Sequence, residues 1–176
     1  MKKIFFGATF CLTVTVLNGQ IAIGKPNIDG NSTILDFDNI ATNTRGIILP
    51  AVSNTNSTLS STPTANNGTF IFDLSDNKIK MYENNIWKDL SDAGNSSAVA
   101  VNSTAELPSL QGVIMGSSAS DAKGILVLES ANKSMILPKI ANPHTTVKSP
   151  YPGMMCYDTA GKAIAVFDGN VWNYWK

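Results

Sequence analysis

Apolar and polar positions follow the same order in two stretches of the chain. Residues 68–87 read as a glycine, a short apolar run, an aspartate, a second apolar run, a polar turn and a tryptophan. Residues 153–172 repeat this order 85 residues later. Short runs with alternate apolar side chains, bounded by Asn, Asp and Gly, are typical of β-strands joined by tight turns. Each stretch therefore predicts a small antiparallel β-meander.

The first meander shows how its side chains and turn should be arranged. Phe70 and Phe72 are expected on one face, because alternate residues in a strand point the same way. Asn84-Asn85 suits a two-residue hairpin turn, since asparagine accepts positive φ angles. In the second meander we predict the corresponding turn at Asp168-Gly169.

Shorter apolar segments ahead of each meander also recur. The pairs of similar segments are 21–24 and 113–116, 34–37 and 125–128, and 47–50 and 135–138. Similar blocks that return in the same order indicate a tandem duplication. The sequence therefore predicts an all-β protein with a tandem repeat of two small antiparallel meander units joined by a flexible polar linker.

The first residues have the pattern of a secretory signal peptide. Lys2 and Lys3 precede an apolar run from Ile4 to Leu17, and a small polar group follows it. The run is shorter than the roughly 20 residues that cross a bilayer. We therefore expect residues 1–19 to be a cleaved signal peptide, which leaves no stable membrane span in the mature chain.

The rest of the chain is expected to divide into three parts. These are a first unit at 20–92, a linker rich in Ser, Ala, Asn and Gly at 93–112, and a second unit at 113–176. Within the first unit, residues 53–67 contain one large apolar side chain and predict an exposed, flexible loop. A unit of about 60 residues buries little core alone. We hypothesise that the two copies pack on each other or that the chain forms a homo-oligomer.

Composition argues against several classes of function. Without Lys2 and Lys3, eleven of the thirteen Lys and Arg residues remain against thirteen Asp and Glu, giving a formal charge of −2. A chain without a basic patch is not expected to bind nucleic acid. Cys156 would be the one cysteine of the mature chain, so no intramolecular disulfide is expected. We interpret Cys156 as a small buried strand residue.

No catalytic, cofactor-binding or metal site is predicted. His144 is the single histidine, and no nucleophile motif accompanies it, as a catalytic triad would require. One histidine and one mature cysteine cannot supply the three or four ligands of a zinc site. Two acidic pairs, Asp36 with Asp38 and Asp73 with Asp76, lack the spacing of a calcium loop. We interpret these aspartates as solvated turn residues.

Four aromatic residues are candidates for packing or contact. Trp87 and Trp172 end the two meanders at equivalent places, and we expect both to pack in the core or between subunits. Tyr174 and Trp175, near the C-terminus, are candidates for a ligand or subunit contact. In a carbohydrate-binding alternative, these two would form the stacking platform for a glycan.

Five motifs of the chain recur together in other proteins: Ile21–Gly24, Ile34–Phe37, Thr44–Pro50, Pro150–Thr159 and Asp168–Trp172. With them the chain resembles a family of exported surface proteins of Bacteroidetes. The hairpin portion is also similar to a module of phage tail fibres and other trimeric fibre proteins. The resemblance implies a secreted or surface-exposed β module that belongs to an appendage, an adhesin or an extracellular assembly. It also implies protein partners or a homo-oligomer, for which the fibre proteins indicate a trimer.

Asp158-Thr159-Ala160 resembles the O-glycosylation sequon of exported Bacteroidetes proteins. The resemblance makes Thr159 a candidate for modification.

These observations lead to one expected function and two alternatives. We expect a non-enzymatic, exported structural or adhesive component at the cell surface or outside the cell, with the periplasm as the alternative location. The first alternative function is a carbohydrate-binding module, and the second is a receptor-binding module like those of phage tail fibres.

Overall fold

The computed structural model describes residues 19–59, 63–102, 104 and 112–176. The predicted signal peptide, apart from Gly19, lies outside the described residues, as do residues 103 and 105–111 of the predicted linker. Strands dominate the described chain, and its helical segments are at most four residues long. The predicted all-β class is therefore confirmed.

Each unit contains the predicted three-stranded antiparallel meander. The first meander consists of β5 (Phe70–Asp73), β6 (Lys78–Glu83) and β7 (Ile86–Asp89), and the second of β12 (Met154–Asp158), β13 (Ala163–Phe167) and β14 (Trp172–Trp175). Phe72 lies opposite Ile79, and both are fully buried. Phe70 packs against the same core. The prediction that Phe70 and Phe72 share a face is confirmed.

The turn of the first meander agrees with its prediction. Asn84 and Asn85 connect β6 to β7 with φ angles of 51° and 64°. Both values lie in the left-handed region, which asparagine tolerates better than most residues. The two-residue turn at Asn84-Asn85 is therefore confirmed.

The turn of the second meander lies one residue later than predicted. The backbone N–H of Asp168 donates to the carbonyl oxygen of Val171, so the two central residues are Gly169 and Asn170. Asp168 is itself buried, and its Oδ1 accepts hydrogen bonds from the N–H groups of Asn170 and Val171. The aspartate thus precedes and fixes the turn, while Gly169 takes the positive φ angle of 100°. The prediction of Asp168-Gly169 as the central pair was wrong.

Parallel strand pairs were not predicted, yet each unit has two. β4 (Ala51–Val52) pairs with β5, and β11 (Lys139–Ile140) pairs with β12. Ahead of them, β1 (Ile21–Ile23) pairs with β2 (Thr33–Phe37), and β8 (Val113–Met115) pairs with β9 (Leu126–Leu128). Parallel neighbours need a crossover connection of about a dozen residues. The polar segments between these strands provide such crossovers.

Two short strands pair with a sheet of the other unit. β3 (Ile47–Ile48) joins the sheet of the second meander, where it pairs with β12. β10 (Ser134–Met135) joins the first unit, which gives a three-stranded sheet in the order β1-β2-β10. The two copies therefore pack together by exchanging strands.

The predicted loop at 53–67 is partly regular. It contains two short 3-10 helices, η1 (Thr55–Ser57) and η2 (Pro63–Asn66), and residues 60–62 between them lie outside the described residues. Asn66 is buried, and its Oδ1 accepts a 2.9 Å hydrogen bond from the N–H of Lys123 in the second unit. The end of the loop is therefore tied to the other copy.

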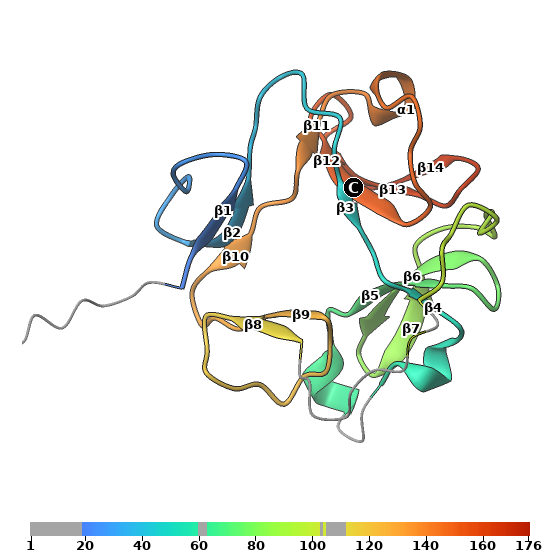
Figure 1. Cartoon of the computed structure of the whole chain (residues 1–176), viewed down its shortest axis with the longest axis horizontal. Helices are drawn as coiled ribbons and strands as arrows, with labels where there is room; N and C mark the ends of the chain where they lie inside the picture. The colour runs from blue at the N-terminus through green and yellow to red at the C-terminus, as the bar shows by residue number, and fades with distance from the viewer. Residues whose placement is uncertain (1–18, 60–62, 103, 105–111) are drawn as a thin grey trace, which may run out of the picture.

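Figure 1 shows how the pieces are arranged. The two meanders lie on one side of the molecule, and the β1-β2-β10 and β8-β9 sheets lie on the other. β3 runs down from the second meander to β4 of the first, so it bridges the two. The short helix α1 (Pro143–Thr146) lies on the outer side of the second meander.

Candidate assembly interface

The first exchange places a segment of the first unit on the edge of the second meander. Ile48 pairs with Met154 and Ile47 with Met155, in antiparallel register. The N–H of Leu49 then donates a 3.0 Å hydrogen bond to the carbonyl oxygen of Gly153. Buried backbone N–H and C=O groups need hydrogen-bond partners whatever the local sequence, and this part of β12 finds its partner in the other copy.

Gly46 explains how the segment comes so close to β12. A Cβ atom at this position would lie 2.5 Å from the carbonyl oxygen of Met155 and 2.8 Å from the Cγ of Met154. A side chain would therefore push β3 off the edge. The glycine ahead of the Ile-Ile-Leu-Pro segment is a requirement of the exchange.

In the second exchange, a segment of the second unit joins a sheet of the first. Ser134 pairs with Thr33 and Met135 with Leu35, in parallel register with an irregularity between them. The N–H of Ile136 continues the ladder with a 2.9 Å hydrogen bond to the carbonyl oxygen of Leu35. Each unit thus completes a sheet of the other.

The interface encloses a shared core. Leu49, Phe72, Ile79 and Leu90 of the first unit pack with Met155 and Val166 of the second in one buried cluster. Burial of a Leu, Phe or Met side chain contributes about 1.5–3 kcal/mol, so each unit would lose part of this contribution when separated. The two copies therefore share one core.

Backbone contacts of the predicted linker reinforce this junction. The N–H of Gly94 donates to the carbonyl oxygen of Asn77 in the first meander, at 2.8 Å. The N–H of Asn95 donates to the carbonyl oxygen of Asp168 in the second, also at 2.8 Å. The start of the linker, predicted to be flexible, instead holds the turns of the two meanders together.

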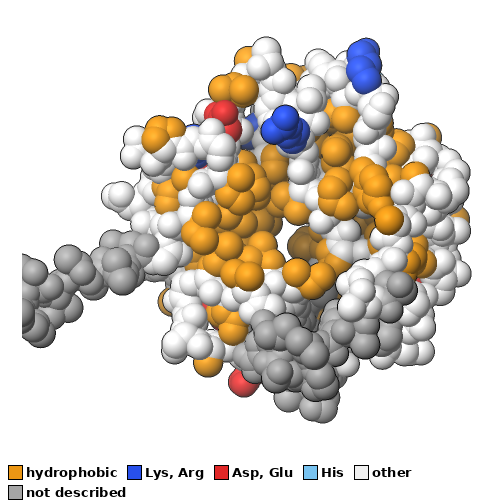
Figure 2. Space-filling view, viewed as in Figure 1, with side chains coloured by type: hydrophobic (Ala, Val, Ile, Leu, Met, Phe, Trp, Pro, Cys, Tyr) orange, Lys and Arg blue, Asp and Glu red, His pale blue; other side chains and the backbone are white. Residues whose placement is uncertain are grey.

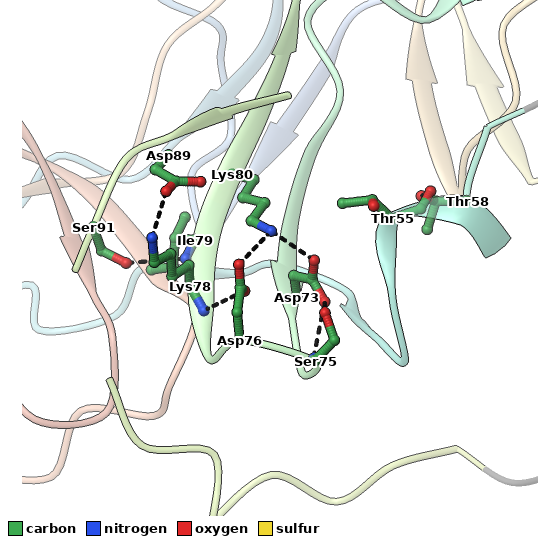
Figure 3. A network of polar contacts seen from close by, with 10 residues as sticks. All are labelled: Thr55, Thr58, Asp73, Ser75, Asp76, Lys78, Ile79, Lys80, Asp89 and Ser91. Atoms are coloured by element: carbon green, nitrogen blue, oxygen red, sulfur yellow. Dashed lines mark hydrogen bonds and ion pairs between the residues drawn. The ribbon is translucent and has the colours of Figure 1, made fainter. Parts of the chain in front are cut away.

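A charged network lies at the base of the first meander (Figure 3). The Nζ of Lys80 lies 2.8 Å from Oδ2 of Asp73 and 2.6 Å from Oδ2 of Asp76. Asp73 is buried, which disfavours its charged form, but hydrogen bonds from Lys80 and Ser75 outweigh this effect. The pKa of the Asp73 carboxyl is therefore held below its ordinary value. This network fixes the turn between β5 and β6.

The interpretation of the four aspartates as solvated turn residues was wrong for Asp73 and Asp36. Asp36 is also buried, and its carboxylate pairs with the ammonium group of Lys25. Both carboxylates point into the protein because a lysine from a neighbouring strand or loop neutralises them there. Within the described residues, no group of three or more His, Cys, Asp or Glu side chains could hold a metal ion.

Tyr174 and Trp175 lie on the last strand and are both partly exposed, at 41% and 47%. Together with Lys78, Asp89 and Asn173 they line an open groove of about 360 Å³ at the junction of the two meanders. The Nε1 of Trp175 donates a 2.8 Å hydrogen bond to the carbonyl oxygen of Leu90 in the first unit. Trp175 is therefore a contact between the two copies inside one chain.

His144 lies on α1 beside the other predicted contact residue. Its Nδ1 lies 3.0 Å from the hydroxyl oxygen of Tyr174. Asp158 lines a second open groove, of about 370 Å³, together with His144 and Tyr174. Its carboxylate accepts hydrogen bonds from the N–H groups of Asn142 and Ala160. Asp158 thus fixes the start of α1, through Asn142, and the turn after β12, through Ala160.

The two predicted packing tryptophans make equivalent ring contacts, and Trp172 also packs against the buried cluster of Ile140, Cys156 and Ala165. Trp87 contacts Tyr82 with ring centroids 5.2 Å apart, and Trp172 contacts Phe167 at 5.4 Å. Both tryptophans are half-buried. Each aromatic pair closes the end of a hairpin across two strands.

The remaining candidates lie on or beside β12. Cys156 is fully buried, as interpreted, and burial raises the pKa of its thiol to about 12. Thr159 is exposed in the turn after β12, and its glycosylation stays a prediction.

Comparison with protein families finds one whose model covers both copies. It is described as a phage tail like trimerisation region, and it matches residues 22–106 and 114–176. The chain belongs to this family. Searches among curated proteins and among solved structures find no match. The matched stretches include both meanders and both exchanged segments.

Membership in the phage tail like trimerisation region family agrees with the resemblance to fibre modules. The family is structural, and a trimerisation region supports a homo-oligomer. No helix among the described residues is long and apolar enough to cross a membrane. Export, a Bacteroidetes source and a glycan partner stay expectations from the sequence.

Sequence reasoning missed the exchanged strands, which form the interface. One signal was present in both copies: Pro50 and Pro138 follow the Ile-Leu pair and end a strand after very few residues. A proline cannot donate to a continuing ladder. A strand this short is poorly suited to form a separate sheet. It can more easily pair with the edge of a sheet that other strands have formed.

Proposed function

We propose that this protein is an exported structural component that holds β modules together in a surface-exposed fibre or appendage. The observation that carries the proposal is the reciprocal strand exchange between two copies of a trimerisation region. The signal-peptide pattern of residues 1–19 and the resemblance to exported surface proteins support the location.

Strand exchange suits a mechanical role. To separate the units, the β3–β12 and β10–β2 hydrogen bonds must break and the shared core must open, because the same chain segments make both. The contacts are therefore lost together rather than one by one. A fibre needs such cooperative joints, and the geometry requires no bound group to provide them.

The location is tested by labelling intact cells. An epitope inserted after Asn56, an exposed position, should be accessible to antibody and to added protease without lysis. The matched control carries the epitope after Lys176, the last residue. A signal that is confined to the periplasm would refute surface exposure, and one confined to the cytoplasm would refute export.

A glycan-binding function is the second candidate, because Tyr174 and Trp175 line an open groove with Asp89 and Asn173. Aromatic faces beside carboxylate and amide groups are suited to a sugar ring. A glycan array with the wild-type chain tests this candidate. Binding that Tyr174→Ala abolishes and Trp87→Phe leaves intact would support it, and an array without any binding would remove it.

The receptor-binding alternative draws on the same family membership. It predicts that the purified protein adheres to whole cells of another type and blocks their recognition by a competing fibre. An absence of cell binding would leave the structural role as the function.

A further inference from the structure

The charged network at the base of the first meander has a counterpart in the second that has lost most of its charges. In the first, Lys80 pairs with Asp73 and Asp76, and Lys78 pairs with Asp89 (Figure 3). The 85-residue repeat replaces these five residues, in the order just given, by Ala165, Asp158, Gly161, Ala163 and Tyr174. Both lysines and two of the three aspartates are therefore missing from the second copy.

The smaller side chains border the groove of about 370 Å³ beside Asp158. Gly161 and Ala163 line it with small groups, and Tyr174 lines it with an aromatic ring. Its volume falls within the range of about 300–1,000 Å³ that is usual for ligand pockets. Ala165 belongs instead to a buried cluster on which other side chains pack. A lysine on β13 could thus not follow the path of Lys80, whereas the groove at the aspartate is open.

Asp158 is the one carboxylate of the network that the second copy keeps. It is 3% exposed, and burial disfavours its charged form. Hydrogen bonds from the N–H groups of Gly161, Asn142 and Ala160 outweigh this effect and hold the pKa of the carboxyl below its ordinary value. A carboxylate has about four acceptor sites, so three donors leave one of them available. The groove therefore presents a negative charge with remaining acceptor capacity.

The chain itself shows which group accompanies a buried carboxylate of this kind. Asp36 pairs with the ammonium group of Lys25, and Oδ2 of Asp73 lies 2.8 Å from the Nζ of Lys80. Among the ion pairs of the described residues, none involves Asp158. A buried charge without a counter-charge is unfavourable. An ammonium group from outside the chain would thus complete the second copy as lysines complete the first.

Two basic residues line the groove without supplying this cation. The Nδ1 of His144 lies 3.0 Å from the hydroxyl oxygen of Tyr174. Lys176 is exposed, and no ion pair joins it to Asp158 in the described part of the chain. The ring of Tyr174 is a further favourable neighbour for an ammonium group.

The groove at Asp158 differs in character from the hollow that Figure 2 shows. There, hydrophobic side chains gather around the middle of one face. A hollow lined in this way offers an incoming group no charge to pair with. The groove combines a buried carboxylate with small side chains and an aromatic ring, so it is suited to a group with an apolar stem and a positive end.

We propose that this groove binds a lysine side chain of a partner protein. Its ammonium group would contact Asp158, and its four-carbon stem would lie over Ala163 beside the ring of Tyr174. The site is distinct from the groove that Trp175 lines with Asp89 at the junction of the meanders. The inference goes beyond the proposed structural role and does not depend on export.

A titration of the purified protein with a lysine derivative tests the site. The probe is Nα-acetyl-lysine methylamide, and its control is the Nε-acetylated form, which has the same stem without the charge. In heteronuclear NMR spectra, the probe should shift the backbone N–H signals of Ala160, Gly161 and Ala163 in a saturable way. Shifts that are absent, or equal for the probe and its control, would overturn the proposal.

Two substitutions locate the contact. Asp158→Asn removes the charge with little change of shape and should weaken binding of the probe by about fivefold or more. Ala160→Lys, at an exposed position beside Asp158, supplies an ammonium group from the chain itself and should compete with the probe to a similar extent. Undiminished binding in both variants, with unchanged circular dichroism, would overturn the proposal.

Ile164→Lys is the matched control for the added charge. Ile164 is 37% exposed and follows Ala163 on β13, so its side chain points to the opposite face of the strand. Binding of the probe should stay unchanged in this variant. A loss equal to that in Ala160→Lys would mean that the added charge acts at a distance, and it would contradict a contact in the groove.

A second probe separates this inference from the glycan candidate. Methyl glucoside that shifts the same signals, in a protein that does not respond to the lysine probe, would overturn the lysine site in favour of a sugar. The surface role is tested separately. A protein that binds the lysine probe but stays in the cytoplasm would keep this inference and refute the proposed location.

Discussion

The indole Nε1 of Trp175 donates a hydrogen bond to the carbonyl oxygen of Leu90, at a distance of 2.8 Å. The two residues hold equivalent positions in the two copies, 85 residues apart. Each follows the tryptophan of its meander by three residues. The duplicated units have thus diverged where they touch: the first keeps a buried leucine and the second an indole that reaches across to it.

Removal of this hydrogen bond should weaken the junction between the units. Trp175→Phe keeps an aromatic ring but loses the N–H donor, so the free energy of unfolding should fall by about 1 kcal/mol. Tyr174→Phe is the control, since its hydroxyl contacts His144 within the second unit. Urea denaturation measures both variants. An equal loss in both would mean that the contact to Leu90 has no special role.

Gly94 should tolerate no side chain. A Cβ atom there would lie 2.0 Å from the carbonyl oxygen of Asp168, so Gly94→Ala must push the two meanders apart. Overpacking of this kind costs about 1–3 kcal/mol, and we expect a lower Tm by differential scanning calorimetry. Gly124→Ala is the control, because its nearest described neighbour would be at 3.6 Å. Equal Tm values for the two variants would contradict the tight contact.

Lys80 should be more important for stability than its neighbour Lys78. Lys80→Met leaves the buried carboxylate of Asp73 without its cation, and breaking a buried pair costs about 3 kcal/mol. Lys78 pairs with Asp89 on the surface, so Lys78→Met should change the unfolding midpoint little. Chemical denaturation at neutral pH compares the two. A Lys80→Met chain as stable as the wild type would show that Ser75 alone satisfies Asp73.

Stability should fall in acid because of three buried carboxylates. For Asp36, Asp73 and Asp158, burial disfavours the charged form, but hydrogen bonds outweigh it and hold each pKa below the ordinary value of 3.8. Their contribution is therefore complete above pH 3.8 and is lost as the pH falls through the lower folded-state pKa values. Unfolding monitored between pH 6 and pH 2 should show this loss.

Asp158→Asn offers a matched comparison for the acid transition. Its amide cannot gain a proton, so the slope of stability against pH should be shallower than in the wild type. Asp38→Asn is the control, at a partly exposed position on a loop. Parallel slopes for the wild type and Asp158→Asn would exclude Asp158 as a contributor.

Local features of the chain were predictable from the sequence because they depend on neighbours in sequence. Phe72 and Ile79 face the core because residues alternate along a strand, and Asn84-Asn85 forms a turn because asparagine accepts positive φ. Burial of Cys156 followed from its place in an apolar run. The error at Asp168 arose because an aspartate side chain can cap the turn that follows it, and sequence patterns alone do not separate this role from a place within the turn.

Leu49 and Leu137 show which feature of the fold the sequence alone does not determine, namely the partner of a strand. Each stands before a proline in an Ile-Leu-Pro segment, so the sequence by itself determined that both belong to short apolar strands in a duplicated all-β chain. The tertiary structure decided that Leu49 binds the edge of the other meander at Gly153, whereas a Cβ atom at the equivalent Gly68 would meet no described atom within 4 Å. The physical reason is that side-chain alternation specifies which face of a strand is buried, whereas backbone hydrogen bonds along its edge accept any strand of suitable register. Which strand pairs with that edge depends on the tertiary structure: on the loops that connect the strands and on the apolar surface that each pairing buries.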